Sequence, residues 1–370
     1  MTLGDLPLFW TFSILFRRKL SNDVAFLSIK NIVIKGIAAC VPPSCRQNPK
    51  VSGSVNMAKT TGVQRMHVAT DSQCASDLCA QAAEELIAKL QWDKKDIGGL
   101  IVVTQTPDYI LPANAPILQS RLGLPTDCFS LDISLGCSGY IYGLTTLAGY
   151  MQNGMIKKAL LLAGDTISRT CSENDKSTYP LFGDAGSATA IEYVENEEGF
   201  KVHLGSDGSG YQAIAIPGGG FRSPYSGNAL TPVLFESGIS RNSLQLTLDG
   251  MDVFSFGIKR APESVNALIE HFQISKPDVD YYFFHQANLM MNERIRKKLE
   301  LPEEKVLNSL RDFGNTSSAS IPLTMVTQAA DPLRNGENRI VACGFGVGLS
   351  WGSLYFTAKN LVIPDLIIYE

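Results

Sequence analysis

Cys137 is the residue in this sequence best placed to act as a nucleophile. It lies in a Gly-Cys-Ser-Gly turn between an apolar run and a segment of helical period. Small residues let the backbone bend sharply there, and a thiol at a helix N-terminus meets a helix dipole and free N–H groups that favour the reactive thiolate. Taken alone, Cys137 could equally be a small buried hydrophobic residue, because free cysteines are among the most buried residue types.

His285 and Asn315, both in the second half of the chain, could complete a site around such a thiol. His285 ends an aromatic run and is one of four histidines, and Asn315 follows a Phe-Gly pair. Singly, each has an ordinary explanation, because buried polar groups at strand ends are usually just hydrogen-bonded and an asparagine after glycine is a common turn or N-cap residue. A catalytic role for His285 and Asn315 is supported only if the fold brings them close to Cys137.

A glycine-rich turn, residues 344–352, follows a buried apolar run near the end of the chain. Its backbone N–H groups could point into a pocket and bind a developing oxyanion. The glycine spacing matches neither a phosphate-binding loop nor a complete dinucleotide fingerprint. A purely structural turn is the alternative, since glycine often marks only an unusual backbone angle.

Alternating sequence patterns supply the elements that must position these residues. From Lys30 onward, short β-branched runs alternate with longer segments of helical period, which is typical of an α/β layered fold. The patterns predict buried central strands at residues 97–104 and 159–164 and a helix at residues 72–90.

A weak internal repeat relates the two halves of the chain. Cys137 begins a helix-like run that leads to a strand ending at Gly164, and Asn315 begins one that leads, over a similar interval, to a strand ending at Gly344. Duplicated halves would place Cys137 and Asn315 at matching strand-to-helix turns, with His285 at the end of a neighbouring strand. A pocket between the halves would then collect all three.

The composition argues against several classes of function. With 32 Lys+Arg against 36 Asp+Glu, the net charge of -4 provides no basic excess for nucleic acid. No stretch approaches the roughly 18 apolar residues that a membrane span needs. The eight cysteines are scattered without zinc-site or disulfide spacing, which predicts no metal and a cytoplasmic, reducing environment.

The first 28 residues are predicted to form an extension outside the core fold. Their apolar stretch, residues 8–16, precedes the basic residues 17–19, and a signal peptide has the reverse order. A docking or membrane-surface helix is the alternative. The predicted division is therefore 1–28 for the extension, 29–200 for a half with the nucleophile, and 201–370 for a half with the histidine and asparagine.

Taken together, the motifs resemble the beta-ketoacyl-acyl-carrier-protein synthase III family of thiolase-like condensing enzymes. The similarity runs from about Ile29 to Phe356. Besides the nucleophile turn and the glycine-rich turn, it is carried by Thr61-Gly62-Val63, Leu181-Phe182-Gly183-Asp184-Ala185-Gly186, Gly205-Ser206-Asp207-Gly208, Pro217-Gly218-Gly219-Gly220, Asp249-Gly250-Met251-Asp252, His285-Gln286-Ala287-Asn288 and Gly314-Asn315-Thr316-Ser317-Ser318. The resemblance implies an α/β thiolase-like fold, in which two duplicated βαβαβαββ halves form a five-layered αβαβα architecture.

The resemblance also implies a mechanism and substrates. Cys137 would take an acyl group from a coenzyme A thioester, with the backbone amides of Cys137 and Val347 as the oxyanion hole. His285 and Asn315 would stabilise the enolate formed when a malonyl thioester on acyl carrier protein loses carbon dioxide. Coenzyme A thioester is a substrate in this scheme, and no permanently bound cofactor or metal is implied. Relatives pair as homodimers, and Leu111 would reach the partner's acyl pocket.

Departures from the family pattern indicate a specialised paralogue rather than ordinary fatty-acid initiation. Asn56 and Thr60 replace a Trp and an Arg that hold adenine, Met290 replaces an Arg that receives the carrier, and Gly136 stands in the nucleophile turn where Ala is common. Carrier-protein docking could fall instead to four basic residues of a predicted helix, or these could be a solvated face: Arg294, Arg296, Lys297 and Lys298. The competing functions are non-decarboxylative acyl transfer from Cys137 to an alcohol or amine, and a catalytically silent scaffolding subunit.

Overall fold

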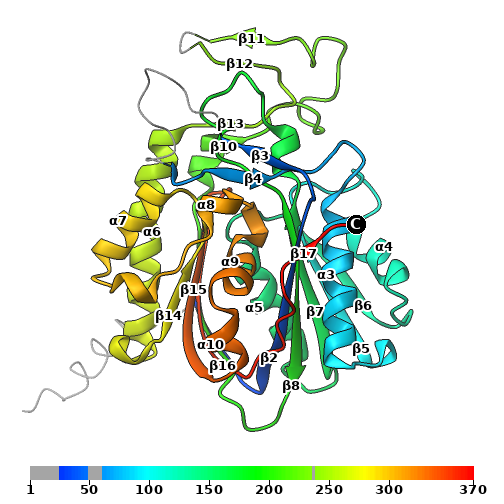
Figure 1. Ribbon diagram of the computed structural model, residues 1–370, viewed down its shortest axis with the longest axis vertical. Coiled ribbons are helices and arrows are strands. Elements are labelled where there is room, and N and C mark those ends of the chain that lie inside the picture. The colour runs from blue at the N-terminus through cyan, green and yellow to red at the C-terminus, as the bar shows by residue number, and fades with distance from the viewer. Residues whose placement is uncertain (1–24, 49–60, 236–237) are drawn as a thin grey trace, which may run out of the picture.

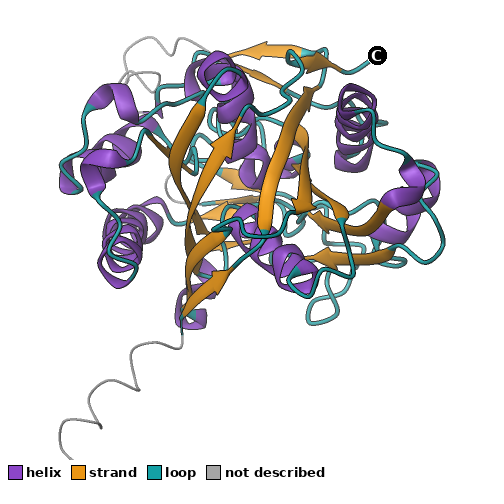
Figure 2. Ribbon diagram, turned by 90° about the horizontal axis from the view of Figure 1, so that it is seen from below, coloured by secondary structure: helices purple, strands orange, loops and turns teal. Residues whose placement is uncertain are grey.

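The computed structural model describes residues 25–48, 61–235 and 238–370. Two β-sheets lie face to face, with helices between them and on both outer faces (Figure 1). Seen from below, the sheets are two bands of strands that helices separate and flank (Figure 2). The predicted five-layered thiolase-like architecture is therefore confirmed.

The first sheet has six strands and holds the nucleophile turn at one end. In spatial order the strands are β17 (Ile367–Ile368), β2 (Ile32–Val41), β8 (Ala185–Tyr193), β7 (Lys158–Asp165), β5 (Ile97–Val103) and β6 (Phe129–Ile133). Helices α3 (Ala75–Leu90) and α4 (Asn114–Arg121) cover its outer face. The central strands β5 and β7 are almost wholly buried, as their β-branched and aliphatic runs predict.

The second sheet has five strands and holds His285. Its order is β1 (Phe26–Ile29), β9 (Phe200–Ser206), β16 (Ser350–Lys359), β15 (Glu337–Gly346) and β14 (Tyr281–Phe284). Helices α6 (Gly250–His271) and α7 (Leu289–Lys298) cover the outer face. The middle layer between the sheets contains α5 (Gly139–Met151), α9 (Ser320–Gln328) and α10 (Ala330–Arg334).

The two sheets are built from matching units. In the first half, β2, α3, β5, α4, β6, α5, β7 and β8 follow one another as the predicted βαβαβαββ. The second half repeats this with β9, α6, β14, α7, α9, β15 and β16, but its third strand is reduced to a single parallel bridge between Val306 and Tyr282. Cys137 and Asn315 therefore occupy equivalent turns that lead into two of the middle-layer helices, α5 and α9.

The predicted boundaries need correction at the N-terminal side. Phe26–Ile29, three of whose four residues were assigned to an extension outside the fold, form β1 and pair antiparallel with β9 of the second sheet. The Phe26 ring stacks on His271 at 3.9 Å between centroids. Each half thus lends a strand to the other's sheet, since β17 from the end of the chain pairs with β2. Residues 1–24 lie outside the described residues.

Short strand pairs close the end of the molecule that carries the site. They are β3 (Cys45–Gln47) with β4 (Arg65–His67), β10 (Ile214–Ala215) with β13 (Thr247–Leu248), and β11 (Val233–Leu234) with β12 (Ser240–Arg241). Figure 1 shows these pairs at the top of the molecule, and the short helix α8 (Leu310–Phe313) lies just below them. None of the described helices is both long enough and apolar enough to cross a membrane.

Candidate active site

Cys137 is held between the start of α5 and the end of β15. A side chain at Gly344 would place its Cβ 2.7 Å from the Cys137 carbonyl oxygen, and one at Gly346 would place it 2.8 Å from the Cys137 sulfur. Only glycine permits so close an approach. A 2.7 Å hydrogen bond also joins the hydroxyl of Ser138, before α5, to that of Ser350, the first residue of β16.

Burial, rather than the helix N-terminus, dominates the ionisation of Cys137. The residue is 7% exposed, and loss of solvation raises the pKa of its thiol to about 12. Hydrogen bonding from the backbones of Val347 and Cys137 and from the Ser317 hydroxyl opposes this rise in pKa, whereas the charge of Asp165 adds to it. The backbone groups at this turn favour the thiolate, as predicted, but loss of solvation outweighs them.

His285 directly follows β14 and is 2% exposed. Its Nδ1 lies 2.8 Å from the Ser320 hydroxyl oxygen, which also accepts a long, 3.4 Å hydrogen bond from the Gln286 backbone N–H. The Ser320 hydroxyl can donate its proton to Nδ1, and in that arrangement the ring proton is on Nε2, which is then a donor. Burial lowers the pKa of His285 to about 3, so the imidazole is neutral near pH 7.

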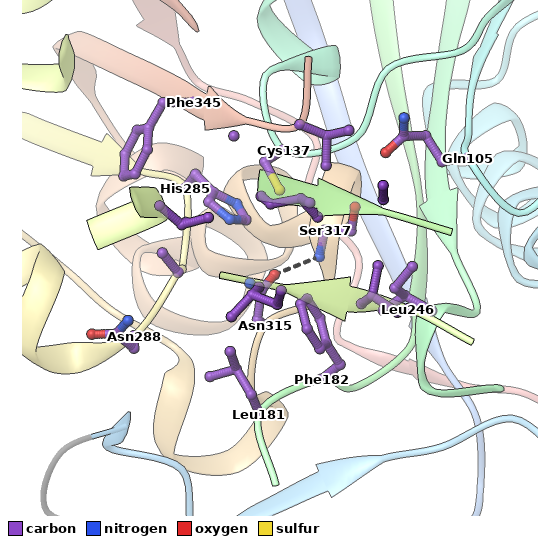
Figure 3. A pocket seen from close by; sticks show the side chains of 18 of the residues that line it. Gln105, Cys137, Leu181, Phe182, Leu246, His285, Asn288, Asn315, Ser317 and Phe345 are labelled. Atoms are coloured by element: carbon purple, nitrogen blue, oxygen red, sulfur yellow. Dashed lines mark hydrogen bonds between the residues drawn. The ribbon is translucent and has the colours of Figure 1, made fainter. Parts of the chain in front are cut away.

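Asn315 is oriented by its own turn. Its Oδ1 accepts a 2.9 Å hydrogen bond from the Ser317 backbone N–H, drawn as a dashed line in Figure 3. Its backbone pairs with Leu181 and Gly183, which fixes the turn against the first half. With the oxygen occupied in this way, the amide N–H₂ remains to donate into the cavity.

One cavity of about 330 Å³ brings these side chains together between the two halves. Figure 3 shows the Cys137 sulfur directed to the same space as the imidazole of His285 and the carboxamide of Asn315. Val347 lines it too, beside the sulfur. The remaining lining is mainly apolar and includes Ile167, Leu181, Phe182, Ile214, Leu246, Leu248, Val253, Met291 and Phe345. The juxtaposition predicted from the internal repeat is what the structure contains.

Asp165 is a buried residue of the site that the sequence analysis did not single out. It ends β7 and is fully buried. One carboxylate oxygen accepts from the Gln105 backbone N–H at 2.7 Å and from the Thr104 hydroxyl at 3.2 Å, and the other accepts from the Ser318 N–H at 3.1 Å and hydroxyl at 2.6 Å. It therefore ties the Asn315 turn of one half to the loop after β5 in the other. An Asp at the end of an apolar strand was the available signal.

Gln105 and Ser317 also line the cavity and were not predicted. Ser317 has a positive φ of 51° in the turn that follows Asn315. Its backbone N–H orients the Asn315 side chain, and its hydroxyl hydrogen-bonds the Cys137 sulfur. Ser317 therefore contacts two of the predicted catalytic residues.

Leu111 and the predicted docking residues lie outside the cavity. Leu111 is 77% exposed in the loop before α4. On α7, Arg296 is bound to the Glu293 carboxylate at 2.8 Å, and Lys298 donates to a backbone carbonyl of α6. Arg294 and Lys297 are exposed. The four basic residues are therefore not equivalent, and Arg296 has a local structural partner. Asn56 and Thr60 lie outside the described residues.

No group of three or more His, Cys, Asp or Glu side chains that could hold a metal ion occurs within residues 25–48, 61–235 and 238–370. All eight cysteines, which these ranges include, are free thiols.

The fold and the cavity define a condensing acyltransferase of the thiolase-like class. Residues 131–208 match the family described as 3-Oxoacyl-[acyl-carrier-protein (ACP)] synthase III, and residues 269–358 match its C-terminal domain. A relative from Streptococcus sanguinis named beta-ketoacyl-[acyl-carrier-protein] synthase III is 33% identical over 81% of this chain and 90% of its own length. One from Streptomyces coelicolor is 32% identical over 88% of this chain and 96% of its own. The crystal structure of a 3-oxoacyl-(acyl-carrier protein) synthase from Burkholderia xenovorans LB400 is 38% identical, with a TM-score of 0.86 over 92% of this chain and 98% of that one. The chain belongs to the 3-oxoacyl-[acyl-carrier-protein] synthase III family.

Proposed function

We propose that the protein joins an acyl thioester to a malonyl thioester by decarboxylative Claisen condensation, through an acyl-Cys137 intermediate. The observation that carries this proposal is one cavity with a thiol beside backbone amides and two neutral donors facing it. A thiol with backbone N–H groups next to it suits thioester exchange, and neutral donors suit a transient enolate.

In the first step Cys137 takes the acyl group. Its sulfur attacks the thioester carbonyl of an acyl-coenzyme A, and the N–H groups of Cys137 and Val347 bind the tetrahedral oxyanion. The carbon–sulfur bond to coenzyme A breaks, and the proton of the Cys137 thiol ends on the departing sulfur. No other group has to change its charge.

In the second step a malonyl thioester loses carbon dioxide. The electron pair of the breaking carbon–carbon bond becomes the enolate, whose oxygen receives hydrogen bonds from His285 Nε2–H and the Asn315 amide. The enolate carbon then attacks the acyl-Cys137 carbonyl and releases a beta-ketoacyl thioester. Cys137 leaves as thiolate and regains one proton from solvent.

We further propose a homodimer built on the edge of the first sheet. β6 ends that sheet in the described part of the chain, and Ile110 and Leu111 in the neighbouring loop are 78% and 77% exposed. An open edge beside exposed apolar side chains favours pairing with a second copy. Such a dimer would carry Leu111 toward the partner's acyl pocket. Light scattering on the purified protein measures the oligomeric state, and a monomer would refute this arrangement.

The carrier of the malonyl group is proposed to be an acyl carrier protein, with Arg294 and Lys297 as its exposed contacts. Met290, at the start of the same helix, is 42% exposed at the position where the family pattern given above has an arginine. This difference at the start of α7 supports a specialised paralogue rather than an enzyme that initiates general fatty-acid synthesis. A cytoplasmic location is proposed from the eight free thiols.

Two measurements on one sample test the reaction. The protein is incubated with a panel of acyl-coenzyme A thioesters, and the mass added to the Cys137 peptide is determined. Malonyl thioester labelled in its free carboxyl is then added, and released carbon dioxide is counted. Cys137→Ser should form no stable acyl thioester, whereas His285→Ala and Asn315→Ala should keep the adduct and lose about 10²-fold or more in decarboxylation.

The other functions predict different results. An adduct that passes to an alcohol or amine without release of carbon dioxide would establish simple acyl transfer instead. Absence of an adduct with every thioester would indicate a silent subunit. Robust turnover with acetyl-coenzyme A and malonyl carrier protein alone would contradict specialisation.

A further inference from the structure

Ser138, the residue after the nucleophile, occupies the N-cap position of α5 but its side chain does not cap the helix. A serine at an N-cap ordinarily accepts a hydrogen bond from a backbone N–H of the first turn, and here the side chain makes no such bond. Ser138 is fully buried, and its hydroxyl lies 2.7 Å from that of Ser350 at the start of β16. The Ser138 side chain therefore joins the nucleophile turn to the second sheet instead of to its own helix.

The direction of each hydrogen bond follows from the number of protons available. The Ser350 hydroxyl lies 2.7 Å from the Val347 carbonyl oxygen, which can only accept, so Ser350 donates its single proton there. In the contact with Ser138, Ser350 can then only accept, and Ser138 has to donate. The two serines thus form a chain of hydroxyls that ends on the carbonyl of Val347.

This chain of hydroxyls returns to the nucleophile. The backbone N–H of Val347 hydrogen-bonds the Cys137 sulfur. Starting from the sulfur, the contacts pass through Val347, Ser350 and Ser138 and come back along the backbone to Cys137. Both residues that supply N–H groups to the proposed oxyanion hole, Cys137 and Val347, are therefore members of one closed ring.

The Val347 carbonyl depends on Ser350 more than the surrounding turn does. Val347 lies in the three-residue turn between the paired residues Gly346 and Ser350. In the part of the chain that the structure describes, no backbone N–H donates to the Val347 carbonyl. Leu349, at the other end of the turn, is fixed separately by backbone hydrogen bonds of 2.8 and 3.0 Å with Asp207. Loss of the Ser350 hydroxyl should therefore release Val347 without opening the whole turn.

We infer that Ser138 and Ser350 are positioning residues, which hold the Val347 N–H where it can bind the oxyanion of the acylation step. The inference rests on the proposed function, because acylation of Cys137 is the step that forms this oxyanion. A donor stabilises an oxyanion best when it is oriented before the charge develops, and buried hydroxyls provide this orientation without adding charge to the site. Neither serine is among the described residues that line the cavity, so both act through Val347.

Two rates measured on the same thiol test the inference. Acylation of Cys137 by an acyl-coenzyme A forms a tetrahedral oxyanion, whereas alkylation by iodoacetamide displaces iodide and puts no negative charge on a carbonyl oxygen. The ratio of acylation to alkylation cancels any change in the fraction of thiolate, because that fraction affects both rates. Each rate is followed by the mass added to the Cys137 peptide, with the acyl-coenzyme A that acylates the wild-type protein fastest.

Removal of each hydroxyl should lower this ratio by a different amount. Ser350→Ala removes both hydrogen bonds and frees the Val347 carbonyl, so the ratio should fall about tenfold, less than the roughly 10²- to 10³-fold effect of losing a donor outright. Ser138→Ala leaves Ser350 bonded to Val347 and should lower the ratio about threefold. The double variant should match Ser350→Ala alone, because Ser138 acts through Ser350.

Ser353→Ala is the matched control. Ser353 lies on the same strand, and its hydroxyl makes a fully buried contact of the same 2.7 Å length with that of Ser264. Ser353→Ala therefore removes one buried hydroxyl from β16, as Ser350→Ala does, but at a distance from the turn. It should keep the wild-type ratio of acylation to alkylation.

The remaining outcomes separate the inference from the proposed function. A wild-type ratio in both Ser350→Ala and Ser138→Ala would refute the positioning role and leave acylation of Cys137 intact. Penalties that multiply in the double variant would show that Ser138 does not act through Ser350. If Ser350→Ala does not fold, the ratio in Ser138→Ala decides alone. Absence of an acyl adduct on the wild-type protein with every thioester would refute the proposed function itself.

Discussion

Replacement of Gly346 by alanine tests whether close contact between β15 and the nucleophile turn sets the position of the sulfur. The new Cβ would lie 2.6 Å from Cys137 Cβ and 2.8 Å from its sulfur. Ordinary contact begins near 3.4 Å, so the Cys137 side chain must retreat by roughly 0.6–0.8 Å or β15 must move outward. Either movement separates the sulfur from the Val347 amide.

The expected effect is large on catalysis and moderate on stability. A displacement approaching 1 Å costs about 10²-fold in rate, and loss of one oxyanion donor costs about 10²- to 10³-fold. The rate of Cys137 acylation should therefore fall about 10²-fold, the equivalent of about 2.7 kcal/mol. Overpacking should lower the free energy of unfolding by about 1–3 kcal/mol.

Gly149 provides a matched control on the helix that starts at the nucleophile turn. A Cβ there meets nothing within 4 Å. Gly149→Ala should stabilise the protein by about 0.5–1 kcal/mol and leave acylation unchanged. The adduct is measured by intact mass and the stability by urea denaturation. A folded Gly346→Ala variant that acylates within threefold of the wild-type rate would show that the approach of β15 does not position the sulfur.

Four further predictions follow from individual contacts. Asp165→Asn puts an N–H₂ group where the backbone and hydroxyl donors now meet an oxygen, so it should lower the free energy of unfolding by about 1–3 kcal/mol. It also removes a negative charge near Cys137, so iodoacetamide should alkylate the Cys137 thiol faster. Slower alkylation would contradict this prediction. Leu111→Phe should shorten the longest acyl chain accepted, and an unchanged preference among acyl-coenzyme A thioesters would remove it from the acyl pocket. Lys297→Ala should raise KM for the malonyl carrier at unchanged stability, whereas Arg296→Ala should cost about 1 kcal/mol of stability by urea denaturation, and the reverse pattern would reassign the two residues. His285 has a pKa of about 3 in the folded protein and about 6.5 in the unfolded protein, so protonation favours the unfolded state as the pH falls from 6.5 to 3. The free energy of unfolding should therefore drop over this range in the wild-type protein and drop less in His285→Asn. Equal slopes of free energy against pH in the two proteins would mean that the imidazole is not buried.

The site residues could be predicted because their signals are local. The turn around Cys137 combines small residues with the start of a helical pattern, and the same sequence of patterns recurs around Asn315. Because the two halves are duplicated, residues at matching points of the two patterns are expected at matching positions in the fold. Each residue also had an ordinary explanation, and it was the repeat together with the resemblance to the synthase III family that predicted one cavity for His285, Asn315 and Cys137.

The features that were missed depend on contacts between distant segments. Phe26 is in the fold because β1 pairs with β9, which follows far along the chain. Asp165 bonds to Ser318 in the other half, and a sequence pattern carries no record of such a pair. The larger effect of burial on the pKa of Cys137 was missed for the same reason, because the helix N-terminus is a local feature and burial is not.

The absence of cations from the described lining of the cavity explains how the proposed reaction could favour decarboxylation over simple transfer. A malonyl carboxylate that enters leaves water for a site with no Lys or Arg and with the buried charge of Asp165 nearby. Its charge is poorly compensated there. In the proposed reaction, loss of carbon dioxide would move that charge to the enolate oxygen, to which His285 and Asn315 would donate hydrogen bonds as neutral groups. Since both donors are fixed by their own hydrogen bonds before substrate arrives, the stabilisation belongs to the product of decarboxylation more than to the carboxylate. A variant with a cationic side chain in the lining of the cavity should therefore bind malonyl thioester more tightly and decarboxylate it more slowly.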